Sequence, residues 1–462
     1  MKIKYKFLGG ILISLCVLPF LSCKKSFLDK KPDQSLLVPT TLQDFQAILD
    51  DNIDMNAAPY LNMVATDDII TTDEGLNGAD YLIKNSYLWA KDIYAGQTDY
   101  NWNVPYLQVF YANIVLEGLQ KYQPSPSEQI RWNQIKGAAL FYRSFAFYNI
   151  AQQFAAPYVP ATANKDAGIP IRLTADVNVK SVRGTLAQSY AQIVADFAAA
   201  SELLPDQVAF ATQPTRAAAL GMLARTYQTM QQYDHSAAAA TACLAIRPDL
   251  MDYNTFNPSV TRPFPRVLPT NLNPEILFYT PLISNASFLI SPSLTFIDPQ
   301  LYQSYANEDL RKVLFFRTSG DNVIYKGNYS NGANVFAGIA TDEVYLIRAE
   351  ARIRTGQMSD GLSDLNKLLK SRYKTGSFTA ISAATRREAL KIVLRERRKE
   401  LVYRNLLRWT DLKRLNQEDD LKITITRTSG GKTYSLTPGD PRYAFPIPDD
   451  EIARSGMTQN PR

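Results

Sequence analysis

The stretch from Thr385 to Leu415 has the most regular spacing of apolar and polar positions in the chain. Its apolar residues recur at steps of three and four: Ala389, Leu390, Val393, Leu394, Leu401 and Val402. That period is typical of an amphipathic α-helix, which buries one stripe of its surface. Thr385, followed three residues later by Glu388, matches the capping box that often starts a helix. The pattern therefore predicts a helix that begins near Thr385.

Arg397 falls on the apolar face of this predicted helix, because it lies four residues before Leu401. A charge on a buried face costs roughly several kcal/mol unless an opposite charge meets it. We expect a buried ion pair between Arg397 and Asp411 in the next helical segment, or an acid on a neighbouring helix. The alternative is a solvated charged face, with Glu400 and Arg404 as a surface pair.

Similar helical periods recur along the chain, and several of the segments come in adjacent pairs. The predicted helices are residues 40–50, 105–122, 128–154, 185–203, 214–231, 236–246, 341–355 and 360–372. The pair 214–231 with 236–246 is similar to a tetratricopeptide unit, and 341–355 with 360–372 repeats the pattern. The spacing is not uniform, which excludes a simple solenoid. We predict a mostly α fold, a tetratricopeptide-like scaffold of helix hairpins with a long irregular, loop-rich insertion and a few short β-hairpins.

Residues 247–340 form the predicted insertion, which is rich in proline and aromatic residues and has little helical period. Long irregular segments inside compact proteins are usually functional. Pro105 is expected to open its helix, since proline is tolerated in a first turn. The other expectations are loops at 60–74 and 81–103, short strands at 278–282 and 323–329, and a β-hairpin formed by 423–427 and 432–436.

Composition excludes several kinds of chemistry. A single histidine, His235, cannot build a His-based catalytic triad or a zinc site with several histidines. Asp67, Asp68, Asp73 and Glu74 lie close together, but their spacing fits no dedicated calcium loop such as the EF-hand. We therefore expect no catalytic residue, no metal site and no cofactor.

Residues 1–22 have the organisation of a bacterial signal peptide, with a basic start and an apolar run too short for an ordinary spanning helix. The run ends in a small residue followed by Cys23, which resembles a lipobox, so cleavage would leave Cys23 as a lipid-modified N-terminus. An uncleaved anchor is the alternative. Loss of Lys2, Lys4 and Lys6 lowers the net charge from +6 to +3, which does not favour nucleic acid as a partner.

Four short motifs in the C-terminal half carry a family resemblance. They are ERRKEL at 396–401, RWTDLKR at 408–414, YAFPIPDDEI at 443–452 and TQNP at 458–461. In this order and at these distances they resemble the SusD/RagB family, nutrient-binding lipoproteins of the Bacteroidetes outer membrane. The resemblance implies a signal peptide at 1–22, an N-terminal helical region at 23–250, and a C-terminal region at 251–462 that includes the insertion.

The resemblance also implies a function. Such a protein is held on the outer membrane by lipid on Cys23, faces the cell exterior, and captures oligosaccharides or, less often, peptides. It delivers them to a partner SusC-like TonB-dependent transporter and needs no turnover. One alternative is a glycoside hydrolase, for which Asp67 would have to meet Asp342 or Glu343. Another is a tetratricopeptide-like adaptor whose only ligand is a protein.

Aromatic residues are the candidate ligand contacts, because the apolar C–H faces of sugars stack on rings while amides and carboxylates bind hydroxyls. Tyr100-Asn101-Trp102-Asn103 is the strongest local pattern, since two rings alternate with two amides. The resemblance implies Trp102 first, together with aromatics of the insertion and an acid near residue 67. The further candidates are Asp67, Asp68, Tyr279, Phe288, Tyr302 and Tyr325.

Overall fold

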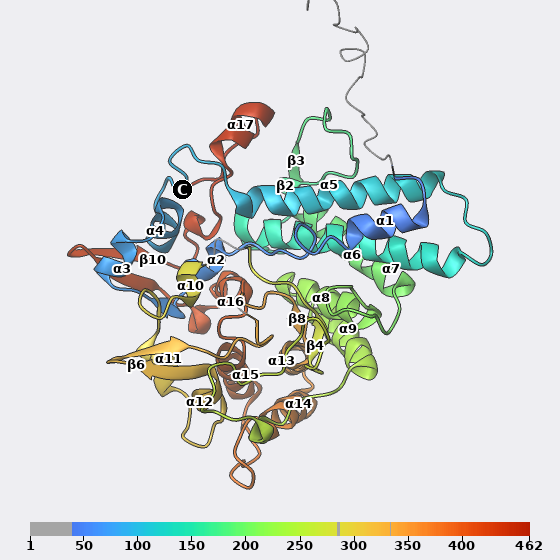
Figure 1. The fold of residues 1–462 in the computed structure, drawn as a ribbon. Helices are drawn as coiled ribbons and strands as arrows, with labels where there is room; N and C mark the ends of the chain where they lie inside the picture. Colours follow the sequence, from blue (N-terminus) through green and yellow to red (C-terminus); the bar gives the residue numbers. More distant parts are fainter. Residues whose placement is uncertain (1–38, 284–286, 333) are drawn as a thin grey trace, which may run out of the picture. The chain divides into compact units, whose positions relative to one another are not determined.

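Helices, several of them paired as antiparallel hairpins, are the main secondary structure of the protein, as the sequence predicts (Figure 1). The computed structural model describes residues 39–283, 287–332 and 334–462, so Cys23 and the predicted signal peptide lie outside the described residues. The helices are α1 (Leu42–Leu49), α2 (Leu61–Val64), α3 (Asp73–Asn77), α4 (Tyr81–Tyr87), α5 (Tyr100–Lys121), α6 (Gln129–Phe154), α7 (Leu186–Leu203), α8 (Arg216–Thr229), α9 (Tyr233–Ile246), α10 (Ser287–Ile290), α11 (Pro299–Gln303), α12 (Arg311–Phe315), α13 (Thr341–Arg354), α14 (Met358–Lys370), α15 (Arg386–Glu400), α16 (Leu407–Leu415) and α17 (Asp449–Ser455).

The strands are short and pair only in twos. They are β1 (Ile69–Ile70), β2 (Ala167–Pro170), β3 (Arg183–Thr185), β4 (Ile276–Phe278), β5 (Phe296–Ile297), β6 (Phe316–Ser319), β7 (Asn322–Tyr325), β8 (Ile339–Ala340), β9 (Ile425–Ser429) and β10 (Lys432–Leu436). All the pairs are antiparallel: β1 with β5, β2 with β3, β4 with β8, β6 with β7, and β9 with β10. Single 3₁₀ turns lie at Tyr253–Thr255, Asp419–Leu421 and Pro441–Tyr443.

Helix α6 is the centre of the N-terminal half, where it packs between α5 and α7. Every residue from Gly137 to Phe154, about five turns, is buried. Close approach to α7 depends on Gly137, because a Cβ at that position would lie 3.0 Å from the Cβ of Leu203. A helix surrounded by other helices needs no polar face, which explains why its apolar residues follow no single stripe.

The two tetratricopeptide-like pairs form the hairpins α8–α9 and α13–α14, and α13 also packs against α8 and α9. A second, smaller apolar cluster fills the space between α13, α14 and α15. Its members include Leu346, Ile353, Leu365, Leu368, Leu369, Leu390, Val393 and Leu401. The apolar residues whose spacing predicted α15 therefore lie on the helix face that packs into this cluster.

Three local predictions are wrong. The segment 81–103 contains α4 and the first turn of α5, and Pro105 lies inside α5 instead of opening it. The helix starts earlier because the carbonyl of Asp99 accepts hydrogen bonds from the backbone N–H groups of Trp102 (3.2 Å) and Asn103 (3.0 Å). The segment 60–74 likewise contains α2 and the start of α3.

The insertion is ordered by short strand pairs that join distant parts of the chain. Strand β5 pairs with β1, and β4 pairs with β8, while β6 and β7 form a hairpin. The hairpin β9–β10 forms where the sequence predicts it, with Lys432 opposite Ser429 beside the two glycines. Across the described ranges, no helix is both long and apolar enough to cross a bilayer.

Candidate functional site

The first turn of α5 is fixed by Asp99, whose buried carboxylate is the N-cap. Its Oδ1 accepts hydrogen bonds from the backbone N of Asn101 (2.9 Å) and from Asn101 Nδ2 (2.8 Å). Asn101 Oδ1 in turn accepts one from the backbone N of Tyr60 at 2.7 Å. These contacts fix where the helix begins and which way its first turn faces. Residues at steps of four from Trp102 then lie on the same face of the helix.

Three rings follow each other along that face at steps of four, and together they wall a cavity of about 430 Å³. They belong to Trp102, Tyr106 and Phe110. We call this space the α5 cavity. Its other lining residues are Asn103, Leu107, Arg172, Val177, Ser181 and Glu451. The volume lies within the range of small-ligand pockets, roughly 300 to 1,000 Å³.

The rings of the cavity are held in place from behind. Trp102 is only 3% exposed; its ring centroid lies 4.8 Å from that of Tyr106 and 4.9 Å from that of Phe154, edge to face. The Tyr106 hydroxyl donates a hydrogen bond to the carbonyl of Pro170 at 3.0 Å. Burial raises the pKa of Tyr106 well above its ordinary value, so the hydroxyl stays protonated and keeps this bond. Two of the three rings, Trp102 and Tyr106, are thus positioned by contacts within the protein.

Polar groups face the rings from two distant segments. Arg172 donates from Nη1 to the carbonyl of Val179 (2.7 Å) and from Nη2 to that of Asp176 (2.7 Å), which closes the segment 172–181 into a loop. Glu451 comes from α17, and burial together with the nearby Asp450 raises the pKa of its carboxyl. An arginine, an amide, a hydroxyl and a carboxyl thus surround an aromatic wall, which is the chemistry that binds polyols.

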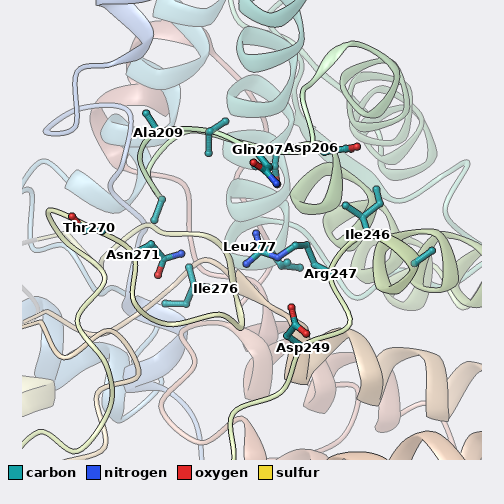
Figure 2. A pocket seen from close by; sticks show the side chains of 14 residues that line it. Asp206, Gln207, Ala209, Ile246, Arg247, Asp249, Thr270, Asn271, Ile276 and Leu277 are labelled. Carbon is teal, nitrogen blue, oxygen red and sulfur yellow. The ribbon is translucent and has the colours of Figure 1, made fainter.

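Size alone would select other cavities. Two hollows of about 770 Å³ are larger than the α5 cavity. Figure 2 shows one of them, where Gln207, Arg247 and Asn271 project from three segments toward the same space. Neither hollow has an aromatic residue in its lining. The α5 cavity is smaller but combines rings with polar groups, so it is the stronger candidate for a sugar.

The predicted quartet at residues 100–103 is divided by the helix. Trp102 and Asn103 line the α5 cavity. Tyr100 is 57% exposed at the start of the helix, and Asn101 is buried as part of the cap. Alternation of rings and amides suggested a shared surface, but consecutive residues of a helix point in directions about 100° apart.

The candidate aromatics of the insertion pack against other parts of the protein, and Tyr325 stacks on Tyr403 with ring centroids 4.3 Å apart. Tyr279 stacks on Phe336 with ring centroids 6.2 Å apart, and Phe288 is buried. Tyr302 and Tyr325 both contact Phe316, at 5.7 and 6.3 Å. The structure therefore brings Tyr302 and Tyr325 together but joins neither of them to Trp102, whose ring partners are on α5 and α6.

Asp67 and Asp68 are tied to two arginines of the C-terminal helices. Asp67 accepts two hydrogen bonds from Arg408, at 2.7 and 2.6 Å, and Asp68 accepts one from Arg398 Nε at 2.9 Å. Although burial opposes it, the two guanidinium groups hold the pKa of Asp67 below its ordinary value. Both acids have structural partners, which accounts for their position without a ligand.

The carboxylates considered for glycoside hydrolysis are in separate ion pairs. Asp342 meets Arg404 at 2.7 Å, and Glu343 meets Arg225 at 2.6 Å. Asp67 pairs with Arg408 at 2.6 Å, so each of the three acids has an arginine partner. Among the described residues no group of three or more His, Cys, Asp or Glu side chains is placed to hold a metal ion.

Arg397 is buried, and its Nε donates to Asp411 at 2.9 Å, the partner expected from the spacing. Asp411 also pairs with Arg414 at 2.8 Å. The alternative surface pair is absent from the described residues, since Glu400 is buried against Arg372 and Arg311. The pair of Arg397 with Asp411 joins α15 to α16 and belongs to the scaffold.

Sequence reasoning missed Tyr106, Phe110, Arg172 and Glu451. The two rings could have been found, because they follow Trp102 at steps of four in the sequence. Arg172 and Glu451 could not, since segments 60 to 350 residues further along reach the cavity only through tertiary contacts.

Asp99→Asn is expected to stabilise the protein at pH 7.5 by about 2 kcal/mol and to change little at pH 4. Burial raises the pKa of Asp99 to about 6. The folded state thus holds this proton more tightly than the unfolded chain, and stability falls as pH rises through about 6. Asparagine can still cap the helix. Urea unfolding at both pH values measures the difference, with Asp80→Asn at the exposed N-cap of α4 as control.

Comparisons with known proteins agree with this architecture. Residues 26–228 match the SusD-like family model described as "Starch-binding associating with outer membrane", and residues 325–462 match the model of the SusD family. No curated protein sequence matches the chain.

Solved structures share the fold over nearly their whole length. A SusD superfamily protein from Bacteroides thetaiotaomicron is 22% identical with a TM-score of 0.75, covering 91% of this chain and 100% of that one. One from Bacteroides fragilis is 18% identical with a TM-score of 0.71, covering 91% and 99%. A SusD-like carbohydrate binding protein from Bacteroides vulgatus is 18% identical with a TM-score of 0.67, covering 90% and 97%. Because SusD family models match an N-terminal and a C-terminal part of the sequence and SusD superfamily structures share the fold, the chain belongs to the SusD/RagB family.

Proposed function

We propose that the protein captures oligosaccharides in the α5 cavity. The observation that carries this is that the rings of Trp102, Tyr106 and Phe110 line one cavity together with Arg172 and Glu451. Sugar C–H faces stack on such rings, while the guanidinium and the carboxyl bind hydroxyls. The similar structure from Bacteroides vulgatus is that of a SusD-like carbohydrate binding protein, which supports the same ligand class.

The proposal includes the setting implied by the family. The protein is held on the outer membrane by lipid on Cys23, faces the cell exterior, and delivers its ligand to a SusC-like TonB-dependent transporter. Residues 24–38 would then serve as the tether between Cys23 and the first described residue, Pro39. Co-purification of a large outer-membrane barrel with the wild-type chain, and its loss in Cys23→Ala, tests this part.

Calorimetric titration of the chain that starts after Cys23 tests the ligand class. The panel contains α-glucans, β-glucans, mannans, xylans and short peptides. We expect saturable binding of one glycan class with no product formed. Tyr106→Ala and Phe110→Ala should each weaken it about tenfold, because each removes one stacking ring worth about 1.4 kcal/mol.

Two variants serve as controls for that titration. Phe210→Ala removes a ring that is 52% exposed and lies outside the α5 cavity, so affinity should not change. Tyr106→Phe keeps the ring and loses only the hydrogen bond to Pro170, so most of the affinity should remain. If a peptide binds and no glycan does, the ligand is a peptide and not an oligosaccharide. If Phe210→Ala weakens glycan binding as much as Tyr106→Ala and Phe110→Ala do, the binding site is not the α5 cavity.

A further inference from the structure

Three lysines gather around a separate cavity of about 480 Å³ at the end of α14. Lys367 and Lys370 come from the last turn of that helix, and Lys374 from the turn that follows it. All three side chains are exposed. Among the described residues that line the cavity, Asp252 is the one acid, so the lining carries an excess of positive charge. We call this the lysine pocket.

The lysines have no carboxylate partner within ion-pair distance among the described residues, although the chain pairs most of its buried cations. Cations in the last turn favour the helix dipole, which accounts for Lys367 and Lys370. It does not account for Lys374, which lies beyond the helix end, or for a cavity between the three. Lys367 Nζ also lies over the ring of Tyr345, 4.9 Å from its centroid. Lys370 and Lys374 are therefore the two lysines of this lining that have neither an ion pair nor a ring contact among the described residues, although like charges placed together repel.

The rim of the lysine pocket is built before any ligand binds. Asn254 Nδ2 donates to Asp252 Oδ1 (2.8 Å) and to the carbonyl of Tyr373 (3.0 Å). Asn254 Oδ1 accepts a hydrogen bond from the backbone N of Thr375 at 3.0 Å. One amide thus joins the turn at 252–254 to the turn at 373–375, and Lys374 is held between them.

A half-buried ring completes the lining. Phe378 contacts Tyr373 with centroids 5.5 Å apart and lies in the wall of the pocket. A ring offers a stacking face to a sugar, Asp252 offers an acceptor for a hydroxyl, and ammonium groups bind a sulfate or a carboxylate. A free inorganic anion would use only the lysines and leave the ring and Asp252 without a role.

We propose that the lysine pocket binds an acidic oligosaccharide, with its sulfate or carboxylate group between the three lysines and its ring against Phe378. This assignment rests on the proposed function in one respect, namely that the ligand is a glycan. It specifies the ligand further, as a glycan that carries negative charge. It also names a second binding region, which shares no lining residue with the α5 cavity.

The test compares isomaltohexaose with its sulfated form, which share one backbone and differ in charge. Calorimetric titration at 50 mM and 300 mM NaCl is run on the wild type, on Lys370→Ala/Lys374→Ala, and on Lys121→Ala. Lys121 is a matched control, since it is an exposed lysine in the last turn of α5 and does not line the pocket. Inorganic sulfate is added as a competitor.

We expect the wild type to bind the sulfated form more tightly than the neutral form, and to bind it more weakly at 300 mM than at 50 mM NaCl. The double variant should bind the sulfated form about tenfold more weakly than the wild type, and Lys121→Ala should bind it as the wild type does. Equal binding of the sulfated form to the wild type and the double variant overturns the proposal, as does no binding at all. If inorganic sulfate binds as tightly as the sulfated glycan, the pocket holds simple anions and the glycan assignment is wrong.

Two further arms separate this proposal from the others. Vesicles of phosphatidylglycerol are tested against vesicles of phosphatidylcholine; lysine-dependent binding to the former without binding of the sulfated glycan assigns the pocket to a lipid surface instead. Tyr106→Ala should leave the charge-dependent part of the affinity intact. If Tyr106→Ala loses binding of a neutral glycan and the double lysine variant keeps it, the α5 cavity is supported as the glycan site, even where the proposal for the lysine pocket is overturned.

Discussion

Arg372→Ala is expected to lower the free energy of unfolding by about 4 kcal/mol, because it leaves buried carboxylates without their cation. The Arg372 side chain is completely buried. It donates to both oxygens of Glu275, at 2.9 and 3.0 Å, and from Nε to Glu400 at 2.7 Å. Its guanidinium also lies 4.0 Å from the ring centroid of Tyr253. One residue thus connects the insertion to α14 and α15.

Urea unfolding of the variant measures this loss, with Arg454→Ala as the matched control. Arg454 is 76% exposed and lies 3.5 Å from Asp450, so its removal should change stability by less than about 0.5 kcal/mol. The added change Glu275→Gln should recover part of the loss in Arg372→Ala, since it removes one orphaned charge. A loss in Arg372→Ala as small as that of the control would mean that the buried network does not hold the insertion.

Trp102→Ala should lower stability by about 4 kcal/mol and also abolish glycan binding. The first effect follows from burial, since the indole packs against Tyr106 and Phe154. The second follows from position, because the same ring forms the inner wall of the α5 cavity and sets the orientation of Tyr106. Urea unfolding and calorimetric titration below the unfolding transition measure the two effects separately.

Trp132→Ala is the control for Trp102→Ala. Trp132 lies on α6, is partly buried, and donates from Nε1 to the carbonyl of Leu119 at 3.3 Å. Its removal should cost about 2 kcal/mol and leave glycan affinity unchanged. Full glycan affinity in folded Trp102→Ala would remove Trp102 from the site.

The helix pairs could be predicted because their apolar periods are local properties of the sequence. The pairing of Arg397 with Asp411 followed from one further step, since a charge on an apolar face needs a partner and the next segment supplies one. The start of α5 could not be placed, because Pro105 suggested a first turn while Asp99 provides the actual cap. Pro105 lies six residues after Asp99, in the second turn of the helix that this cap starts.

The candidate site was harder to predict for a physical reason. Core and ligand surfaces use the same aromatic residues, so composition cannot separate Tyr279, which stacks on Phe336, from Tyr106, which lines the α5 cavity. The polar side of the cavity comes from Arg172 and Glu451, which no local pattern links to α5. Trp102 was singled out by the local alternation of rings and amides and by a family resemblance, not by helical periodicity.

The central claim is that a sugar occupies the α5 cavity. A crystal structure of the protein with the glycan selected by titration tests it most directly. We predict a sugar ring stacked on Tyr106 or Phe110, with hydroxyls within hydrogen-bond distance of Arg172 or Glu451. A glycan bound against the exposed ring of Tyr100, or anywhere else with the α5 cavity empty, would contradict it.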